Sequence, residues 1–84
     1  MKIALKLFAS LSDYLPAEAR TSNRLELDLD DAATIAGIIE EFRLPPRLVH
    51  LVLLNGVFVP PAERAQRRLA SGDTLAIWPP VAGG

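Results

Sequence analysis

The chain has 84 residues, of which 50% are hydrophobic and 23% charged, a composition typical of one globular domain rather than a disordered segment. Its net charge is −1, whereas a protein that binds nucleic acid usually carries an excess of basic residues. The chain has no cysteine, which excludes disulfides, thiolate metal sites and a cysteine nucleophile. No apolar run reaches the length of a membrane span and no leader opens the chain. We therefore expect a cytoplasmic protein with no nucleic-acid partner, no membrane and no metal.

The N-terminal third predicts two strands joined by a short helical turn. Residues 2–8 alternate between apolar and polar side chains, as a strand with one buried face does, and Phe8 falls on the face opposite the buried leucines. A helical turn over residues 10–15 ends at Pro16, because proline cannot continue it. Residues 24–28 alternate again and predict the second strand.

The middle of the chain predicts one main helix, with Thr34 as its N-cap. Four apolar residues recur at helical spacing and form one buried stripe: Ile35, Ile38, Ile39 and Phe42. We expect the helix to run until Pro45-Pro46, since a residue that precedes proline is biased out of the helical conformation.

A hairpin follows the helix. Residues 48–54 are almost continuously apolar and predict a strand that is covered over most of its length. Asn55-Gly56 predicts a type I′ turn that returns the chain into residues 57–59. His50, alone of its kind in the chain, is more commonly a packed or capping side chain at such a position than a metal ligand.

The segment after the hairpin, residues 62–70, predicts a brief helical turn with three arginines. The three are Arg64, Arg67 and Arg68. Such a cluster could bind an anion, but a solvated arginine-rich turn is the commoner case. Whether these arginines contact a partner is left open by the sequence. Residues 74–78 then alternate and predict the last strand, which ends at Trp78.

This order of elements predicts an α+β domain, residues 1–78, in which one helix covers one face of a mixed sheet and the other face is wet. The alternation places three of the five aromatic residues on the outer face: Phe8, Phe58 and Trp78. Such a cluster predicts a surface for a partner, unless the loops at 9–23 and 60–73 cover it.

Residues 79–84 are expected to form a flexible tail, because two prolines end the last strand and glycine is the costliest residue to order. Two interpretations stay open at this point. Most ends of this kind are simply frayed. This tail begins with two conformationally restricted prolines, continues with two apolar residues and ends in two glycines that have no side chain. Such a segment also suits insertion into a narrow channel of a partner.

The ending from Leu69 to Gly84, with its Gly-Asp pair, its Leu-x-Ile strand and the letters PPVAGG, resembles the C-terminus of the MoaD family, the small subunit of molybdopterin synthase. Leu7-Phe8-Ala9 and Ala33-Thr34-Ile35 also fit these MoaD/ThiS ubiquitin-like sulfur carriers, and the resemblance spans the whole chain in element order. It implies a β-grasp (ubiquitin-like) fold. Trp78 stands where the family often has phenylalanine.

The resemblance also implies a carrier that is not catalytic alone. The carboxylate of Gly84 would be adenylated by an E1-like adenylyltransferase of the MoeB type, which uses ATP and Mg²⁺, and then converted to a thiocarboxylate, with Gly83 leaving the carbonyl open. The sulfur would serve molybdenum or tungsten cofactor biosynthesis on the large synthase subunit (MoaE type). Partner contacts would come from the aromatic face and the tail: Phe8, Phe58, Trp78, Pro79, Pro80, Val81 and Ala82.

Two alternatives remain beside this interpretation. One is another carrier of the same fold, of the ThiS type, that serves thiamine, cysteine or tRNA thiolation, or a ubiquitin-like protein modifier. The other is a non-catalytic interaction domain whose tail is inert.

Overall fold

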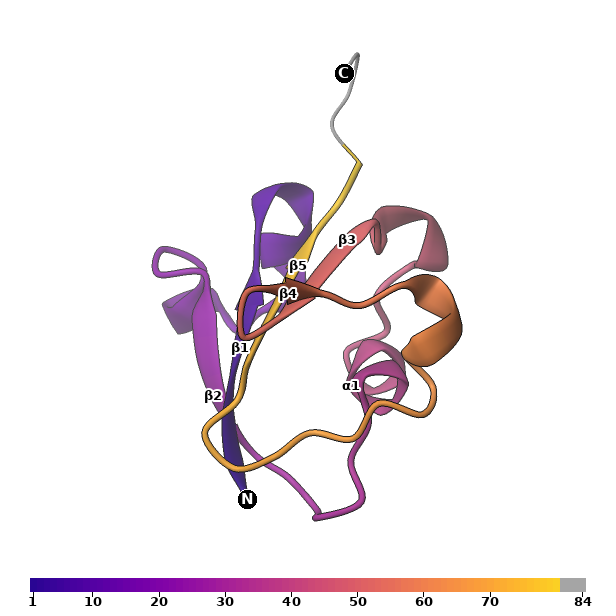
Figure 1. Ribbon diagram of the computed structural model, residues 1–84. Helices are drawn as coiled ribbons and strands as arrows, with labels where there is room; N and C mark the ends of the chain where they lie inside the picture. The colour runs from indigo at the N-terminus through magenta and orange to yellow at the C-terminus, as the bar shows by residue number, and fades with distance from the viewer. Residues whose placement is uncertain (81–84) are drawn as a thin grey trace.

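The computed structural model describes residues 1–80, which form a five-stranded mixed sheet with one α-helix on one of its faces (Figure 1). The strands are β1 (Lys2–Leu7), β2 (Arg24–Asp28), β3 (Leu51–Leu54), β4 (Val57–Phe58) and β5 (Thr74–Trp78). Their order across the sheet is β2-β1-β5-β3-β4, with β1 and β5 parallel and the other neighbours antiparallel. The first and last strands therefore lie side by side at the centre, as in a β-grasp fold.

Short helical segments connect the strands. The α-helix, α1, spans Ile35–Glu41, and 3₁₀ turns occupy η1 (Ala9–Tyr14), η2 (Ala17–Ala19), η3 (Pro46–Leu48) and η4 (Pro61–Glu63). In residues 1–80, every helix is far too short to cross a membrane.

The core lies between the inner face of the sheet and α1. Leu5, Leu7 and Ile77 come from the two central strands, and Ile35 and Ile38 come from α1. All five are buried almost completely, and each such side chain stabilises the fold by roughly 1.5–3 kcal/mol relative to exposure. The alternation of apolar residues in the first and last strands is thus explained by contact with the helix.

Two local signals behave as the sequence predicts. Thr34 caps α1, because its Oγ1 accepts a hydrogen bond from the backbone N–H of Gly37 at 3.1 Å. Asn55 and Gly56 have φ values of 51° and 82°, and a type I′ turn requires positive φ at both positions.

The helix and the third strand are shorter than predicted. The α-helix ends at Glu41, because Arg43 adopts a left-handed conformation with φ 54° and turns the chain so that Leu44 enters the core. The two prolines do not end α1 but begin η3, whose N-cap is Pro45. As η3 occupies Pro46–Leu48, β3 starts only at Leu51.

Candidate functional site

The face of the sheet that points away from α1 is divided into a charged half and an apolar half. The charged half lies on β1 and β2 and presents Lys2, Lys6, Arg24, Glu26 and Asp28. The expectation of a wet outer face holds for this half only, because the neighbouring half on β5, β3 and β4 carries almost no polar side chains.

The apolar half follows from the strand register. Leu51 lies opposite Trp78, and Leu53 lies opposite Ala76 on one side and Phe58 on the other. Directly opposed residues of neighbouring strands share a face of the sheet. We call this surface the apolar patch, and its members are Phe8, Leu51, Leu53, Phe58, Ala76 and Trp78. Phe58 is 51% exposed, so the patch presents an aromatic side chain to solvent.

Phe8 and Trp78 form the end of the patch nearest the tail. Their rings stack with centroids 4.3 Å apart and planes inclined by 5°. The parallel pairing of β1 with β5 brings them together, because the backbone N–H of Phe8 donates to the carbonyl of Ile77 at 3.2 Å. Each ring covers one side of the other, so both remain half-buried and keep a fixed orientation.

The base of the tail is held by the sheet. The carbonyl of Trp78 accepts a hydrogen bond from the backbone N–H of His50 at 3.1 Å. Pro79 is buried and Pro80 is exposed. The remaining predicted site residues, Val81, Ala82, Gly83 and Gly84, lie outside the described part of the chain, so their roles stay predictions.

The arginine-rich segment is not a purely solvated turn, and that interpretation is wrong for Arg64. Its side chain is only 8% exposed, with Nε donating to the carbonyl of Val59 at 3.1 Å and Nη2 to the carbonyl of His50 at 3.3 Å. Burial lowers the pKa of Arg64 from its usual range. Arg67 pairs with Glu63 at 3.3 Å, and the backbone of Arg68 bridges to Thr34.

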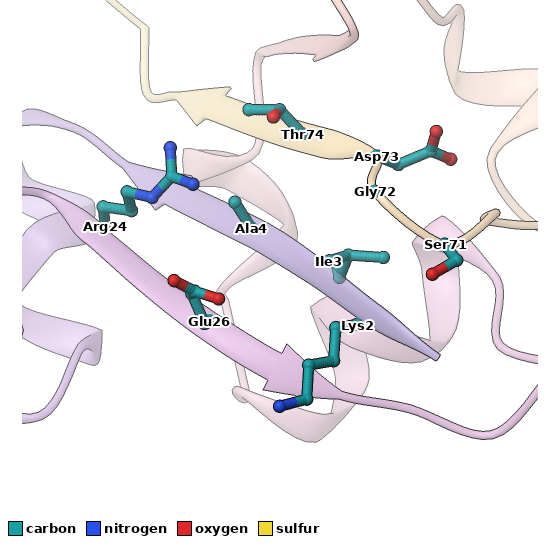
Figure 2. A pocket seen from close by; sticks show the side chains of 9 residues that line it. All are labelled: Lys2, Ile3, Ala4, Arg24, Glu26, Ser71, Gly72, Asp73 and Thr74. Carbon is teal, nitrogen blue, oxygen red and sulfur yellow. The ribbon is translucent and has the colours of Figure 1, made fainter.

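A shallow pocket of about 240 Å³ lies in the charged half, where β1, β2 and the turn before β5 meet (Figure 2). Figure 2 shows Arg24 and Glu26 on β2 beside the small side chain of Ala4. The pocket mixes the two signs of charge, and its Asp73 is already engaged by Asn55 and by the backbone N–H of Ala70. In the described residues, no three His, Asp or Glu side chains converge as metal ligands do.

Sequence reasoning missed two members of the patch, Leu51 and Leu53. A continuous apolar run does not reveal which of its residues face outward. The usable signal was the Asn55-Gly56 turn, whose two-residue loop places Leu53 opposite Phe58 and so assigns both to one face.

Taken together, these features define a β-grasp domain whose last strand lies at the centre of the sheet, beside an apolar patch, and leads directly into the tail. The chain belongs to the ThiS family, which matches residues 6–84. Its fold is that of the ThiS/MoaD-like, ubiquitin-like sulfur carriers, as the resemblance in its sequence implied.

Solved structures agree with this assignment. SAMP1 of Haloferax volcanii, a small archaeal modifier protein, is 28% identical with a TM-score of 0.66, and each chain is covered in full. The HVO 2177 protein of the same organism is 27% identical with a TM-score of 0.74, over 100% of this chain and 87% of that one. One chain from the complex of subunits 1 and 2 of the molybdopterin-converting factor of Helicobacter pylori matches at 19% identity and a TM-score of 0.61. The match covers this chain and that chain in full, and at this identity it supports the fold alone. No curated protein matches the sequence significantly.

Proposed function

We propose that this protein is a sulfur carrier that acts as the small subunit of a molybdopterin synthase, with the carboxylate of Gly84 as its reacting group. The observation that carries the proposal is the Phe8–Trp78 stack on the apolar patch, immediately before the tail. A partner that contacts this stack also receives the tail, so docking and delivery become one event. The membership of the ThiS family supports the chemistry.

The proposed reaction begins with activation, because a carboxylate is a poor electrophile until one of its oxygens becomes part of a leaving group. A Gly84 oxygen attacks the α-phosphate of ATP on an E1-like adenylyltransferase of the MoeB type, and pyrophosphate leaves. Sulfur delivered at the hydrosulfide level then attacks the acyl carbon, and AMP leaves. The product is a thiocarboxylate, a sulfur nucleophile on a chain that has no cysteine.

In this proposal the chain supplies a tethered reactant, and its partners supply the catalytic groups and bind the ATP and Mg²⁺ that adenylation uses. Four residues, Val81 to Gly84, reach at most about 13 Å when extended. That length lets the carboxylate enter a buried site while the domain stays outside. Holding the reactant on a docked domain raises its effective concentration at the acceptor.

The large subunit of molybdopterin synthase, of the MoaE type, is the proposed acceptor partner. The molybdopterin-converting factor of Helicobacter pylori is a complex of subunits 1 and 2, and one chain of that complex has the same fold as this protein. The apolar patch is the surface that we assign to this contact, because its aromatic rings are exposed or half-buried and fixed in place.

Intact mass spectrometry tests the sulfur chemistry. The carrier is incubated with an E1-like adenylyltransferase, ATP, Mg²⁺ and a sulfur donor, and we expect a mass gain equal to the difference between sulfur and oxygen. The same mixture without ATP is the control. No gain with E1-like enzymes of either the molybdopterin or the thiamine branch would contradict the sulfur-carrier proposal.

A second candidate function is protein modification, which the likeness to SAMP1 favours, since that modifier protein is more similar in sequence than the molybdopterin-converting factor chain. The same acyl adenylate would then be attacked by a lysine amine of a target protein, and AMP would leave as an amide forms. Sulfur transfer from the thiocarboxylate form to a pterin precursor on the large subunit distinguishes the first function. Amide-linked products without that transfer would favour the second.

A further inference from the structure

A groove of about 350 Å³ lies on the helix side of the molecule, where α1, η3 and η4 meet. Figure 1 shows η3 and η4 beside α1, on the side of the sheet that carries the helix. Its walls are aliphatic and come from Ile39, Pro46, Val49 and Pro61. Of the described residues that line it, Arg64 is the one that carries a charge. The groove is therefore separate from the apolar patch, which lies on the opposite face of the sheet.

Arg64 is held in this groove with no anionic partner among the described residues. A guanidinium has five N–H donors, and Arg64 uses two of them on the carbonyls of Val59 and His50. In residues 1–80 no carboxylate lies within salt-bridge distance of it, whereas the neighbouring Arg67 is half-buried and paired with Glu63. The fixed guanidinium keeps donors that a ligand in the groove can use.

The surroundings of Arg64 favour an anion for a physical reason. Transfer of a cation from water into a buried site raises its free energy, and burial lowers the pKa of this arginine accordingly. Carbonyl dipoles offset part of this cost, but a carboxylate would add a charge-assisted hydrogen bond to a group that is already positioned. The side chain loses little further freedom on binding, because two hydrogen bonds already hold it.

We propose that this groove docks a segment of a partner protein in which an acidic side chain lies next to an aliphatic one. The aliphatic side chain would lie against the walls formed by Ile39 and Val49, and the carboxylate would accept hydrogen bonds from Arg64. A protein segment fits better than a free small molecule, because sites for small molecules usually enclose most of their ligand. Here Pro46 and Pro61 are exposed, and Ile39 and Val49 are only half-buried, so one side of the groove stays open.

This second docking site goes beyond the proposed sulfur chemistry and does not depend on it. Because the sheet and core separate the groove from the apolar patch, one partner can occupy each side at the same time. The mass assay for thiocarboxylate formation reports on the tail alone, so its failure would not affect the groove.

Peptide titration followed by NMR tests the groove directly. The probes are N-acetylated, C-amidated tetrapeptides that contain leucine and glutamate in either order between two alanines, with glutamine in place of glutamate as the matched control. We expect saturable shifts of the Ile39 and Val49 methyl groups and of Arg64 Nε–H with one of the glutamate peptides. The glutamine peptide should bind at least about tenfold more weakly, because it loses a charge-assisted hydrogen bond.

Variants separate the groove from general electrostatics. Arg64→Met removes two structural hydrogen bonds and can unfold the chain, so Pro46→Glu is the informative change: it places a carboxylate at the exposed rim. We expect at least about tenfold weaker peptide binding, whereas Pro16→Glu, also at an exposed proline beside a 3₁₀ turn, should bind as the unaltered chain does. Absence of shifts at these residues, equal binding of both peptide types, or shifts confined to the apolar patch would overturn the proposal.

Discussion

The rings of Phe8 and Trp78 stack face to face at 4.3 Å, although the two residues lie near opposite ends of the chain. Phe8 directly follows β1 and Trp78 ends β5, so the parallel pairing of these strands brings both rings to one end of the sheet. Pro79 and Pro80 continue from β5 at that same end (Figure 1). The stack is thus an aromatic surface at the base of the segment that we assign to sulfur transfer.

Trp78→Ala should weaken binding to the large synthase subunit by more than about 1 kcal/mol, a loss that only a minority of interface residues cause when they are truncated. The substitution removes the larger ring of the stack and leaves Phe8 without its neighbour. Isothermal titration calorimetry with the purified large subunit measures the change.

Tyr14→Ala is the matched control for Trp78→Ala, because Tyr14 is an aromatic residue that is 37% exposed but lies on η1, outside the patch. It should bind at the unaltered strength. If Trp78→Ala binds as tightly as the unaltered chain, the stack serves only the stability of the monomer.

Deletion of Gly84 should abolish the mass gain in the adenylation assay while leaving the urea midpoint unchanged. The core among the described residues is formed between Ile3 and Ile77, so no core contact is expected to be lost. Tyr14→Ala, which leaves the tail intact and lies outside the patch, is the control and should still gain sulfur. A clear drop in the unfolding midpoint on deletion of Gly84 would show that the tail contributes to the stability of the domain, which the proposal excludes.

Strong local patterns made much of the fold predictable. Residues 24–28 and 74–78 form strands with the predicted bounds, because alternation of apolar and polar residues is a local property of a half-buried strand. The Thr34 cap and the Asn55-Gly56 turn depend on one or two residues each, and both occur as predicted.

The rest depends on contacts between distant segments. The end of α1 is set by the left-handed conformation of Arg43 and the burial of Leu44, although nothing in the local sequence stops the helix before its prolines. The burial of Arg64 requires the carbonyl of His50, just before β3, and that of Val59, just after β4. An aromatic outer face could be predicted by alternation, but the contact of Phe8 with Trp78 requires knowledge that β1 and β5 are parallel neighbours.

Thr34→Ala should lower the free energy of unfolding by about 1 kcal/mol, because the backbone N–H of Gly37 loses its acceptor at the start of α1. Thr34→Ser keeps the hydroxyl and should remain within a few tenths of the unaltered value. Urea unfolding followed by circular dichroism measures both. Equal losses for the two variants would show that the methyl group of Thr34, and not its hydroxyl, stabilises the helix.

Asn55 ties the β3–β4 turn to the start of β5, and its substitutions should separate two contributions to stability. Its Nδ2 donates to Asp73 Oδ1 at 2.9 Å, and its Oδ1 accepts from the backbone N–H of Thr74 at 2.8 Å. Asn55→Gly removes these hydrogen bonds but tolerates the φ of 51°, so we expect a loss of about 1 kcal/mol. Asn55→Ala removes the same bonds and also strains the turn, which adds about 1 kcal/mol.

Urea unfolding of the two Asn55 variants, alone and combined with Asp73→Ala, completes this test. Because Asn55 and Asp73 share a hydrogen bond, the double variant should lose less than the two single variants together. Equal stabilities of Asn55→Gly and Asn55→Ala would mean that the left-handed backbone carries no cost here. Additive losses would mean that Asp73 acts through the backbone N–H of Ala70, where its Oδ2 accepts at 2.8 Å, rather than through Asn55.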